Sequence, residues 1–269
     1  MTLLAAPVKA VARKAGLRRA HVAAARMQAE REVLALTARA KAAATGRILC
    51  YHSVGTPEWG VNDVSPERFA QQIDSAVQLG YRFVPASTVA SGRATANDLA
   101  ITFDDAVASA ATHAAPMLAD RGIPWTLFVV SDWAEGKHEF PPGVLMGWSD
   151  IEKLAASGVE IGSHSVSHPD FGSLDLRVAR HELEQSRRVI GARTGIEADS
   201  FAIPMGQSGN WSPAAHLIAQ ETGYERIYAQ CVNRRPPNTV ARTFITRFDD
   251  RRMFAAALRG AFDDWEEWV

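Results

Sequence analysis

The chain has 269 residues, of which 47% are hydrophobic and 22% are charged, a balance typical of a soluble globular protein with one barrel-sized domain or two small ones. No stretch approaches the ~20 apolar residues of a membrane span, and no run of about 7–15 apolar residues marks a secretory signal. We therefore expect a cytoplasmic protein or one peripheral to the membrane. Only two cysteines occur, Cys50 and Cys231, and we expect two buried thiols rather than a disulfide.

The net charge of −1 conceals an uneven distribution along the chain. Residues 1–47 contain ten Lys/Arg and only two acids, whereas the remainder has 19 basic and 28 acidic residues. This pattern predicts a basic, Ala/Arg-rich helical extension over residues 1–46, with its helix over 8–44, and one catalytic domain over 47–269. Three roles for the extension stay open: a solvated helix resting on the acidic domain, a contact with an anionic membrane or a partner, and a targeting segment.

After Gly46, short apolar runs alternate with amphipathic segments. The expected strands are 47–51, 81–84, 99–103, 125–130, 159–162, 200–203, 225–229 and 243–245. The expected helix starts are the cap pairs Ser65-Pro66 and Ser212-Pro213, a capping box at 149–152, and Asp175 at the head of a helix that reaches about residue 190. Strands that alternate with helices imply a mainly parallel sheet. Seven or eight strands predict an α/β fold, a distorted (β/α) barrel with an extra N-terminal helix.

Polar clusters follow directly on these apolar runs. They are His52, Asp104-Asp105, Ser131-Asp132, the segment from His164 to His168, and Pro204-Met205-Gly206. In a β/α barrel such positions share the C-terminal face, where active sites are built. The sequence spacing alone therefore predicts that the candidate ligands lie together at the C-terminal end of the barrel.

Asp104 and Asp105 end a buried-looking strand, and adjacent carboxylates there indicate a cation. His164 and His168, in a Gly- and Ser-containing loop, are their candidate partners. One carboxylate and two imidazoles make an open, three-ligand metal site, and the second carboxylate is left to act as a base. This combination indicates a metal-dependent hydrolase.

Phe-Asp-Asp occurs twice more, at 248–250 and 262–264. The first copy precedes a helical segment and is expected to cap it, and the second lies in an acidic terminal segment expected to be solvated. His52 is open to either a catalytic role or a hydrogen-bonding role in the barrel rim. His113, His138, His181 and His216 lack an acidic or Gly-rich context and are interpreted as surface or packing residues.

Taken together, these motifs resemble the polysaccharide deacetylase (NodB-homology) family, and within it the members that open with a Tyr-His-x-Val strand. The matching pieces are Tyr51-His52-Ser53-Val54, Thr102-Phe103-Asp104-Asp105, the segment from His164 to His168, and the segment from Phe201 to Gly206. Their order and spacing cover nearly the whole chain after residue 47.

The resemblance implies a deacetylase with one divalent metal, of the Zn²⁺ type. By matching positions, Asp105, His164 and His168 would be the metal ligands and Asp104 the general base. Met205 would contribute its backbone N–H to the oxyanion. In family members with the Tyr-His-x-Val opening, the histidine can serve as the acid, which assigns that role to His52.

The sequence departs from the family pattern at three positions. Ala106 stands where the family has Gly after Asp-Asp, and Ala202 and Met205 replace an Arg and a Tyr. The loss of the Arg would remove a group that orients or tunes the base, whereas a main-chain oxyanion donor tolerates Met205. No Leu-x-His motif occurs near the C-terminus, which leaves His52 as the best acid.

The expected reaction is removal of an N-acetyl group from an amino-sugar-containing glycan or glycolipid precursor. Two alternatives stay open: a metal-dependent amidase acting on a small non-sugar amide, and a non-catalytic sugar-binding relative. Trp133, Trp148 and Trp211 lie near the site segments and either stack on a sugar ring or pack ordinarily. The expected partner is the N-acetylated sugar, with no nucleic acid, and with residues 1–46 available for a peripheral membrane or partner contact.

Overall fold

The computed structural model describes residues 19–38 and 45–266. Its main sheet has nine strands, all paired in parallel. They are β1 (Arg47–Tyr51), β4 (Arg82–Phe83), β5 (Asp98–Phe103), β6 (Thr126–Val129), β7 (Glu160–Ser163), β8 (Ser200–Ala202), β9 (Arg226–Ala229), β10 (Val240–Ala241) and β11 (Thr243–Phe244). All eight strands expected from the sequence are present, and the predicted barrel is confirmed.

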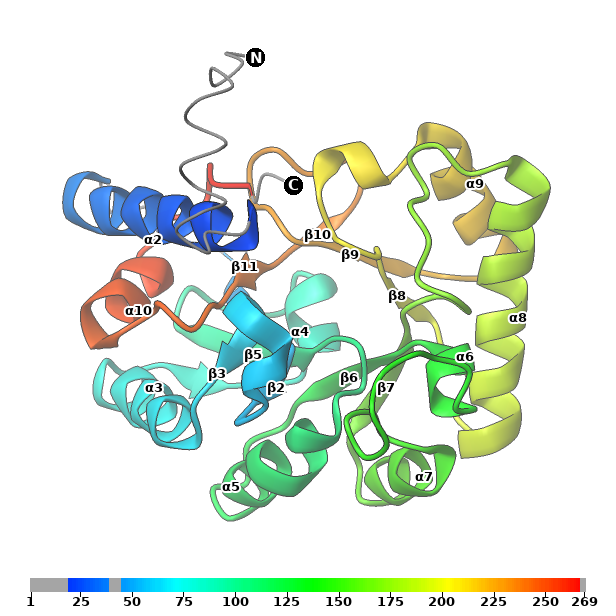
Figure 1. Cartoon of the computed structure of the whole chain (residues 1–269), viewed down its shortest axis with the longest axis horizontal. Coiled ribbons are helices and arrows are strands. Elements are labelled where there is room, and N and C mark those ends of the chain that lie inside the picture. The colour runs from blue at the N-terminus through cyan, green and yellow to red at the C-terminus, as the bar shows by residue number, and fades with distance from the viewer. Residues whose placement is uncertain (1–18, 39–44, 267–269) are drawn as a thin grey trace.

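Helices surround the sheet (Figure 1). They are α2 (Arg19–Thr37), α3 (Pro66–Gln78), α4 (Ala86–Ala90), α5 (Ala115–Ala119), α6 (Ser131–Ala134), α7 (Trp148–Ala156), α8 (Leu176–Thr194), α9 (Pro213–Thr222) and α10 (Arg251–Leu258). Shorter elements are the strand pair β2 (Ser53–Val54) and β3 (Asp63–Val64) and the helical turns η1 (Pro57–Asn62), η2 (Ala110–Ala114) and η3 (Ser208–Asn210). Among these described helices, none is both long and apolar enough to cross a membrane.

A single residue connects the two end strands of the sheet. The sheet order is β10-β9-β8-β7-β6-β5-β1-β11, so β10 and β11 lie at its two ends. In the chain, only Arg242 separates them: Ala241 pairs with Ala229 of β9, and Thr243 pairs with Leu49 of β1. The backbone therefore passes from one end of the sheet to the other at Arg242.

Alternating strand residues fill two different spaces, as the two-residue period of a strand requires. Leu49 and Tyr51 belong to the large buried cluster that includes Phe69 and Ile73 of α3, whereas Ile48 lies in a separate cluster with Phe128 of β6. That second cluster also contains Ala100, Ala202 and Tyr228. A Cβ at Gly162 would come within 2.5 Å of the Phe128 ring, so this ring requires glycine on the neighbouring strand.

Side-chain caps begin several helices where the sequence predicts them. Ser65, Asp175, Ser212 and Asp250 accept hydrogen bonds from the first-turn N–H groups of α3, α8, α9 and α10. The capping box predicted at 149–152 is wrong: α7 already begins at Trp148, and Gly147 is its N-cap without a side-chain bond. Trp148 is only 6% exposed, and its burial places the helix start one residue before Ser149.

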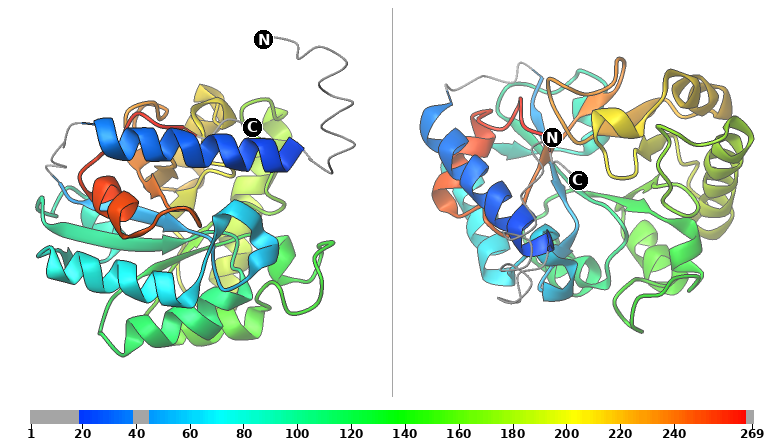
Figure 2. Two further views of the ribbon diagram at one scale, coloured as in Figure 1. Left: turned by 60° about the vertical axis from the view of Figure 1, so that its left-hand side comes forward. Right: turned by 45° about the horizontal axis from the view of Figure 1, so that its top comes forward.

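The N-terminal helix α2 lies against α10 (Figures 1 and 2). Its Arg31 is fully buried and makes a bidentate ion pair with Asp249, with N–O distances of 2.9 and 2.6 Å. The same guanidinium lies 3.9 Å from the ring centroid of Phe262 and 4.8 Å from that of Trp265. Helix α2 is thus fixed to the barrel through a buried charge, while the parts of the predicted helix over 8–18 and 39–44 fall outside the described residues.

Two further expectations concern acids and thiols. Asp263, expected to be solvated, is instead buried and pairs with Arg47, although 216 residues separate the two in the chain. The prediction for 262–264 is therefore wrong at Asp263, because sequence proximity to the acidic terminus does not show a partner on β1. Cys50 and Cys231 are free and buried, as expected.

Candidate metal centre and active site

The adjacent strands β1 and β5 bring His52 and Asp104 to the same edge of the sheet. Tyr51 pairs with Phe103, and the Asp104 N–H donates to the Tyr51 carbonyl at 3.0 Å. The residue after each strand therefore emerges at the C-terminal end of the barrel, as the sequence predicts. Both Asp104 and Asp105 are buried, at 3% and 7% exposure.

Asp104 is held by an arginine that the sequence analysis missed. The Arg242 guanidinium donates to both carboxylate oxygens, at 2.6 and 2.8 Å, and the side chain is 1% exposed. Burial by itself would raise the pKa of the Asp104 carboxyl, but Arg242, with His164 and His52 nearby, holds that pKa well below its usual range. The expectation that Ala202 leaves the base without an arginine is thus corrected: Arg242 reaches it from the far end of the sheet.

A buried thiol completes the surroundings of this carboxylate. The Cys50 Sγ lies 3.5 Å from Asp104 Oδ2 and donates to it. Burial raises the pKa of Cys50 well above its usual range, so the sulfur keeps its proton and remains a donor. Asp104 is therefore ionised and oriented from two sides before any substrate arrives.

Asp105, His164 and His168 converge on one point. The His164 and His168 Nε2 atoms lie 3.5 and 3.6 Å from Asp105 Oδ1, and one candidate ligand atom from each residue falls within 4.8 Å of the others. Asp105 Oδ1 is buried and has no hydrogen-bond partner among the described residues. An unpartnered carboxylate oxygen facing two imidazole nitrogens fits the donor set of a divalent cation such as Zn²⁺.

The protonation of His164 also suits a metal ligand. Its Nδ1 donates to the Ala202 carbonyl at 2.8 Å, which leaves the lone pair on Nε2 directed at Asp105. Burial lowers the pKa of His164 to about 4, so the ring is neutral near pH 7. A neutral imidazole with a fixed tautomer can bind a cation without first losing a proton.

The loop that carries both histidines is tied down by a buried acid of α8. Glu182 accepts hydrogen bonds from the N–H groups of Val166 and Ser167, at 2.8 and 2.9 Å, and from the Ser167 hydroxyl. The Ser165 hydroxyl in turn accepts from the His168 N–H. Helix α8 thus fixes the spacing between the two imidazoles. The sequence around Glu182 does not predict this role.

His52 is buried near Asp104. It is 9% exposed, packs edge-on to Phe244, and is one of the groups that lower the pKa of Asp104. Its Nδ1 is buried without a partner among the described residues. This imidazole therefore has an unused nitrogen at the end of the barrel that carries Asp104.

Left-handed backbone conformations gather at the site. Six described non-glycine residues have positive φ, and all but Asn238 lie in the three site segments. The five are Asp105, Ala106, Ser165, His168 and Met205. Such conformations are costly for residues with a Cβ, and they persist where the surroundings enforce them, most often at functional sites. Met205 (φ 63°) forms the turn after β8, next to Gly206, whose carbonyl accepts from the Gln230 N–H.

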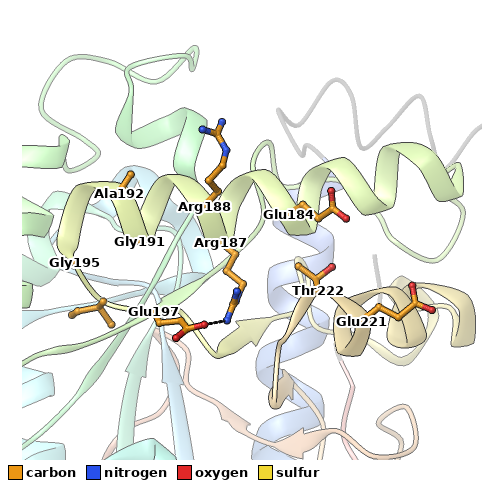
Figure 3. A pocket seen from close by; sticks show the side chains of 10 residues that line it. Glu184, Arg187, Arg188, Gly191, Ala192, Gly195, Glu197, Glu221 and Thr222 are labelled. Carbon is orange, nitrogen blue, oxygen red and sulfur yellow. Dashed lines mark hydrogen bonds and ion pairs between the residues drawn. The ribbon is translucent and has the colours of Figure 1, made fainter.

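A separate hollow of about 580 Å³ lies on the outer surface between α8 and the end of α9 (Figure 3). Two of the charged residues that line it, Arg187 and Glu197, form an ion pair. None of the candidate site residues lines it. The hollow is therefore distinct from the centre at the barrel mouth.

Comparisons with known proteins identify the family. The family model described as polysaccharide deacetylase matches residues 91–227, half of the chain. The chain therefore belongs to the polysaccharide deacetylase family, as the motifs predict. The matched part contains the Asp104-Asp105 pair, both histidines and the turn at Met205.

The individual proteins that the chain resembles share low sequence identity with it. The uncharacterized protein YlxY of Bacillus subtilis is 27% identical over 106 residues, which are 39% of this chain and 29% of that protein. The chain thus spans less than a third of that relative. Among solved structures, IcaB from Ammonifex degensii has a TM-score of 0.66 at 25% identity, covering 79% of this chain and 97% of its own. The Streptococcus pyogenes deacetylase PplD, in complex with acetate, has a TM-score of 0.67 at 18% identity over the same shares and supports the fold alone.

Proposed function

We propose that this protein is a metal-dependent deacetylase that hydrolyses the N-acetyl group of an amino sugar in a glycan or glycolipid precursor. The observation that carries the proposal is the pairing of two carboxylates with different surroundings. Asp105 faces the two imidazoles with an unpartnered oxygen, whereas Asp104 is clamped by Arg242. Asp105 can therefore hold a cation, whereas Asp104, which Arg242 keeps ionised, can accept a proton.

Asp105, His164 and His168 would hold the cation. When bound, it supplies Lewis-acid chemistry, polarising an amide carbonyl and acidifying a water molecule. His164 Nε2 also lies 3.9 Å from Asp104 Oδ2, so the base sits beside the ligand set. This closeness supports a reaction in which one water is both activated and deprotonated at the same place.

The remaining steps use this chain's own groups. Asp104 takes a proton from the attacking water, and oxygen adds to the amide carbon. The Met205 N–H would donate to the oxyanion that develops on the former carbonyl oxygen. His52 would give a proton to the departing nitrogen, so that the C–N bond breaks to yield acetate and a free amine.

The test is acetate release by the metal-loaded protein from N-acetylated sugars in monomeric, oligomeric and lipid-linked form. We expect release from at least one of them, abolished by chelation and restored by added Zn²⁺. His164→Ala should bind less metal than the wild type by elemental analysis. Release from small non-sugar amides alone would favour the amidase alternative, and sugar binding without release would favour a non-catalytic relative.

A further inference from the structure

Helix α2 has two apolar faces, one buried against the rest of the protein and one exposed. It lies on the outside of the barrel beside α10 (Figures 1 and 2). The exposed face carries side chains that recur at helical spacing and fall within about 80° of one another around the helix axis, at about 100° per residue. They are Val22, Ala25, Ala29, Val33 and Leu36, which we call the α2 stripe.

The α2 stripe is not required for the packing of α2 on the barrel. Met27 and Arg31, on the opposite side of the helix, are buried at 7% and 0% exposure. In contrast, Val22, Val33 and Leu36 are exposed at 54%, 57% and 72%. Single exposed apolar side chains are ordinary, but several on one face of a helix indicate a surface that contacts something else.

The sequence around the stripe is strongly basic. Residues 1–18 and 39–44, which flank α2 on both sides, contain six Lys/Arg and no Asp or Glu. The two acids of residues 1–47 are Glu30 and Glu32, which are half-buried, and Glu30 pairs with Arg26 at 2.6 Å. With ten basic and two acidic residues, this segment carries +8, whereas the remainder, with 19 and 28, carries −9. An anionic surface therefore attracts the N-terminal segment and repels the rest of the protein.

Charge also selects among partners for the α2 stripe. A second copy of the chain would bring the same excess of positive charge to the contact, and like charges repel. An anionic bilayer offers both features that the segment requires. Its acyl boundary accepts valine and leucine side chains, and its headgroups attract Lys and Arg by about 1 kcal/mol for each residue near the surface.

We propose that α2 lies on an anionic membrane surface, with the α2 stripe at the boundary between headgroups and acyl chains and the basic flanking residues at the headgroups. The buried ion pair between Arg31 and Asp249 then transmits this attachment to the barrel, because it fixes the opposite face of the helix. The proposal does not depend on the deacetylase function, since it concerns a different surface and is tested by binding alone.

Helix α2 is also connected to the end of the barrel that carries the candidate site. The Trp265 Nε1–H donates to Glu30 of α2 at 3.3 Å, and the Trp265 ring stacks on Phe244 with centroids 6.2 Å apart. Phe244 in turn packs edge-on to His52, with centroids 5.5 Å apart. A protein attached through α2 therefore holds this end of the barrel near the bilayer.

The experiment measures co-sedimentation of the full-length protein with vesicles of phosphatidylcholine, alone or mixed with phosphatidylglycerol. The wild type should bind the mixed vesicles far more tightly, and salt should weaken this binding between about 0.1 and 1 M, as the screening length falls from about 10 to 3 Å. Val33→Asp with Leu36→Asp should weaken it about 30-fold, the equivalent of about 2 kcal/mol for two added charges. The matched control adds the same two acids elsewhere, as Val178→Asp with Leu217→Asp at positions 42% and 60% exposed, and should bind nearly as the wild type does.

A second variant covers the case in which the aspartates unfold α2. Val33→Gln with Leu36→Gln removes apolar surface without changing the charge or the helix propensity much, and it should also bind the mixed vesicles more weakly. Equal binding by the wild type and this variant, equal binding to neutral and mixed vesicles, or no binding at all would overturn the proposal. Light scattering without vesicles tests the other partner: a wild-type dimer that the stripe substitutions convert to a monomer would make the α2 stripe an interface between copies instead.

Discussion

Replacing Arg242 with methionine should destabilise the protein through Asp104 rather than through lost packing. Methionine is apolar and of comparable length, but it leaves a carboxylate that is 3% exposed without its bidentate cation. Removing one partner of a buried ion pair typically costs about 3–5 kcal/mol, because the remaining charge is uncompensated. We expect the free energy of unfolding at pH 7 to fall by that amount.

The pH dependence gives this prediction a sign. In the wild type the pKa of Asp104 is held below its usual range, so its contribution to stability is present above the unfolded-state pKa and is lost as the pH falls through the folded-state value. Without Arg242, burial remains and raises that pKa. In the metal-free Arg242→Met protein, the deficit should therefore shrink on acidification from pH 7 toward pH 4, as Asp104 becomes neutral.

Urea unfolding of the metal-free proteins between pH 4 and pH 7 measures both effects. The matched control is Arg242→Met with Asp104→Asn, which removes both charges and should regain most of the lost stability. Arg242→Lys keeps the charge without the bidentate geometry, so its free energy of unfolding should lie between those of the wild type and Arg242→Met. If Arg242→Met loses less than about 1 kcal/mol, or if the double variant is no more stable than the single one, the argument for a buried, compensated Asp104 is refuted.

Three other predictions concern separate parts of the chain. His52→Ala should lower turnover of amides about 10²–10⁴-fold but spare activated acetate esters, whose leaving groups need little protonation, and equal losses on both would remove it as the acid. Arg31→Met should lower the free energy of unfolding by about 3–5 kcal/mol, whereas Arg26→Met, on the exposed face of α2, should change it by less than about 1 kcal/mol. Similar values for the two variants would show that α2 is not fixed to the barrel. Ala106→Gly should cost almost nothing in urea unfolding, since relief of about 1–2 kcal/mol at its left-handed φ offsets the usual penalty of glycine. The buried helical residue Ala110 should lose about 1 kcal/mol on the same change, and an equal loss at Ala106 would contradict this reasoning.

The sequence predicts those parts of the structure that depend on local pattern. The strand before Asp104 and the cap at Ser65 are visible in it because periodicity and capping chemistry act over a few residues. Ser149 shows the limit of that approach, because the burial of Trp148 moves the start of α7. A good local capping pattern does not prevail over the packing of a large side chain.

The site is predictable to the same extent. The two histidines and the two aspartates follow strands, and parallel strands end on one side, so their convergence can be expected from the chain order. Arg242 could not be assigned in this way, because 138 residues separate it from Asp104 and their contact depends on how the strands at the two ends of the sheet are paired. The available signal was a single arginine inside an apolar strand-like run, which calls for a buried acid as partner.

The central claim is that Asp104 acts as the base beside a cation held by other residues. It is tested most directly by acetate release from metal-loaded wild type and Asp104→Asn, with the metal content measured on the same samples. We expect both proteins to hold about one metal ion per chain and the variant to be about 10²–10⁴-fold slower. A fully metal-loaded Asp104→Asn protein that releases acetate at the wild-type rate would contradict the account.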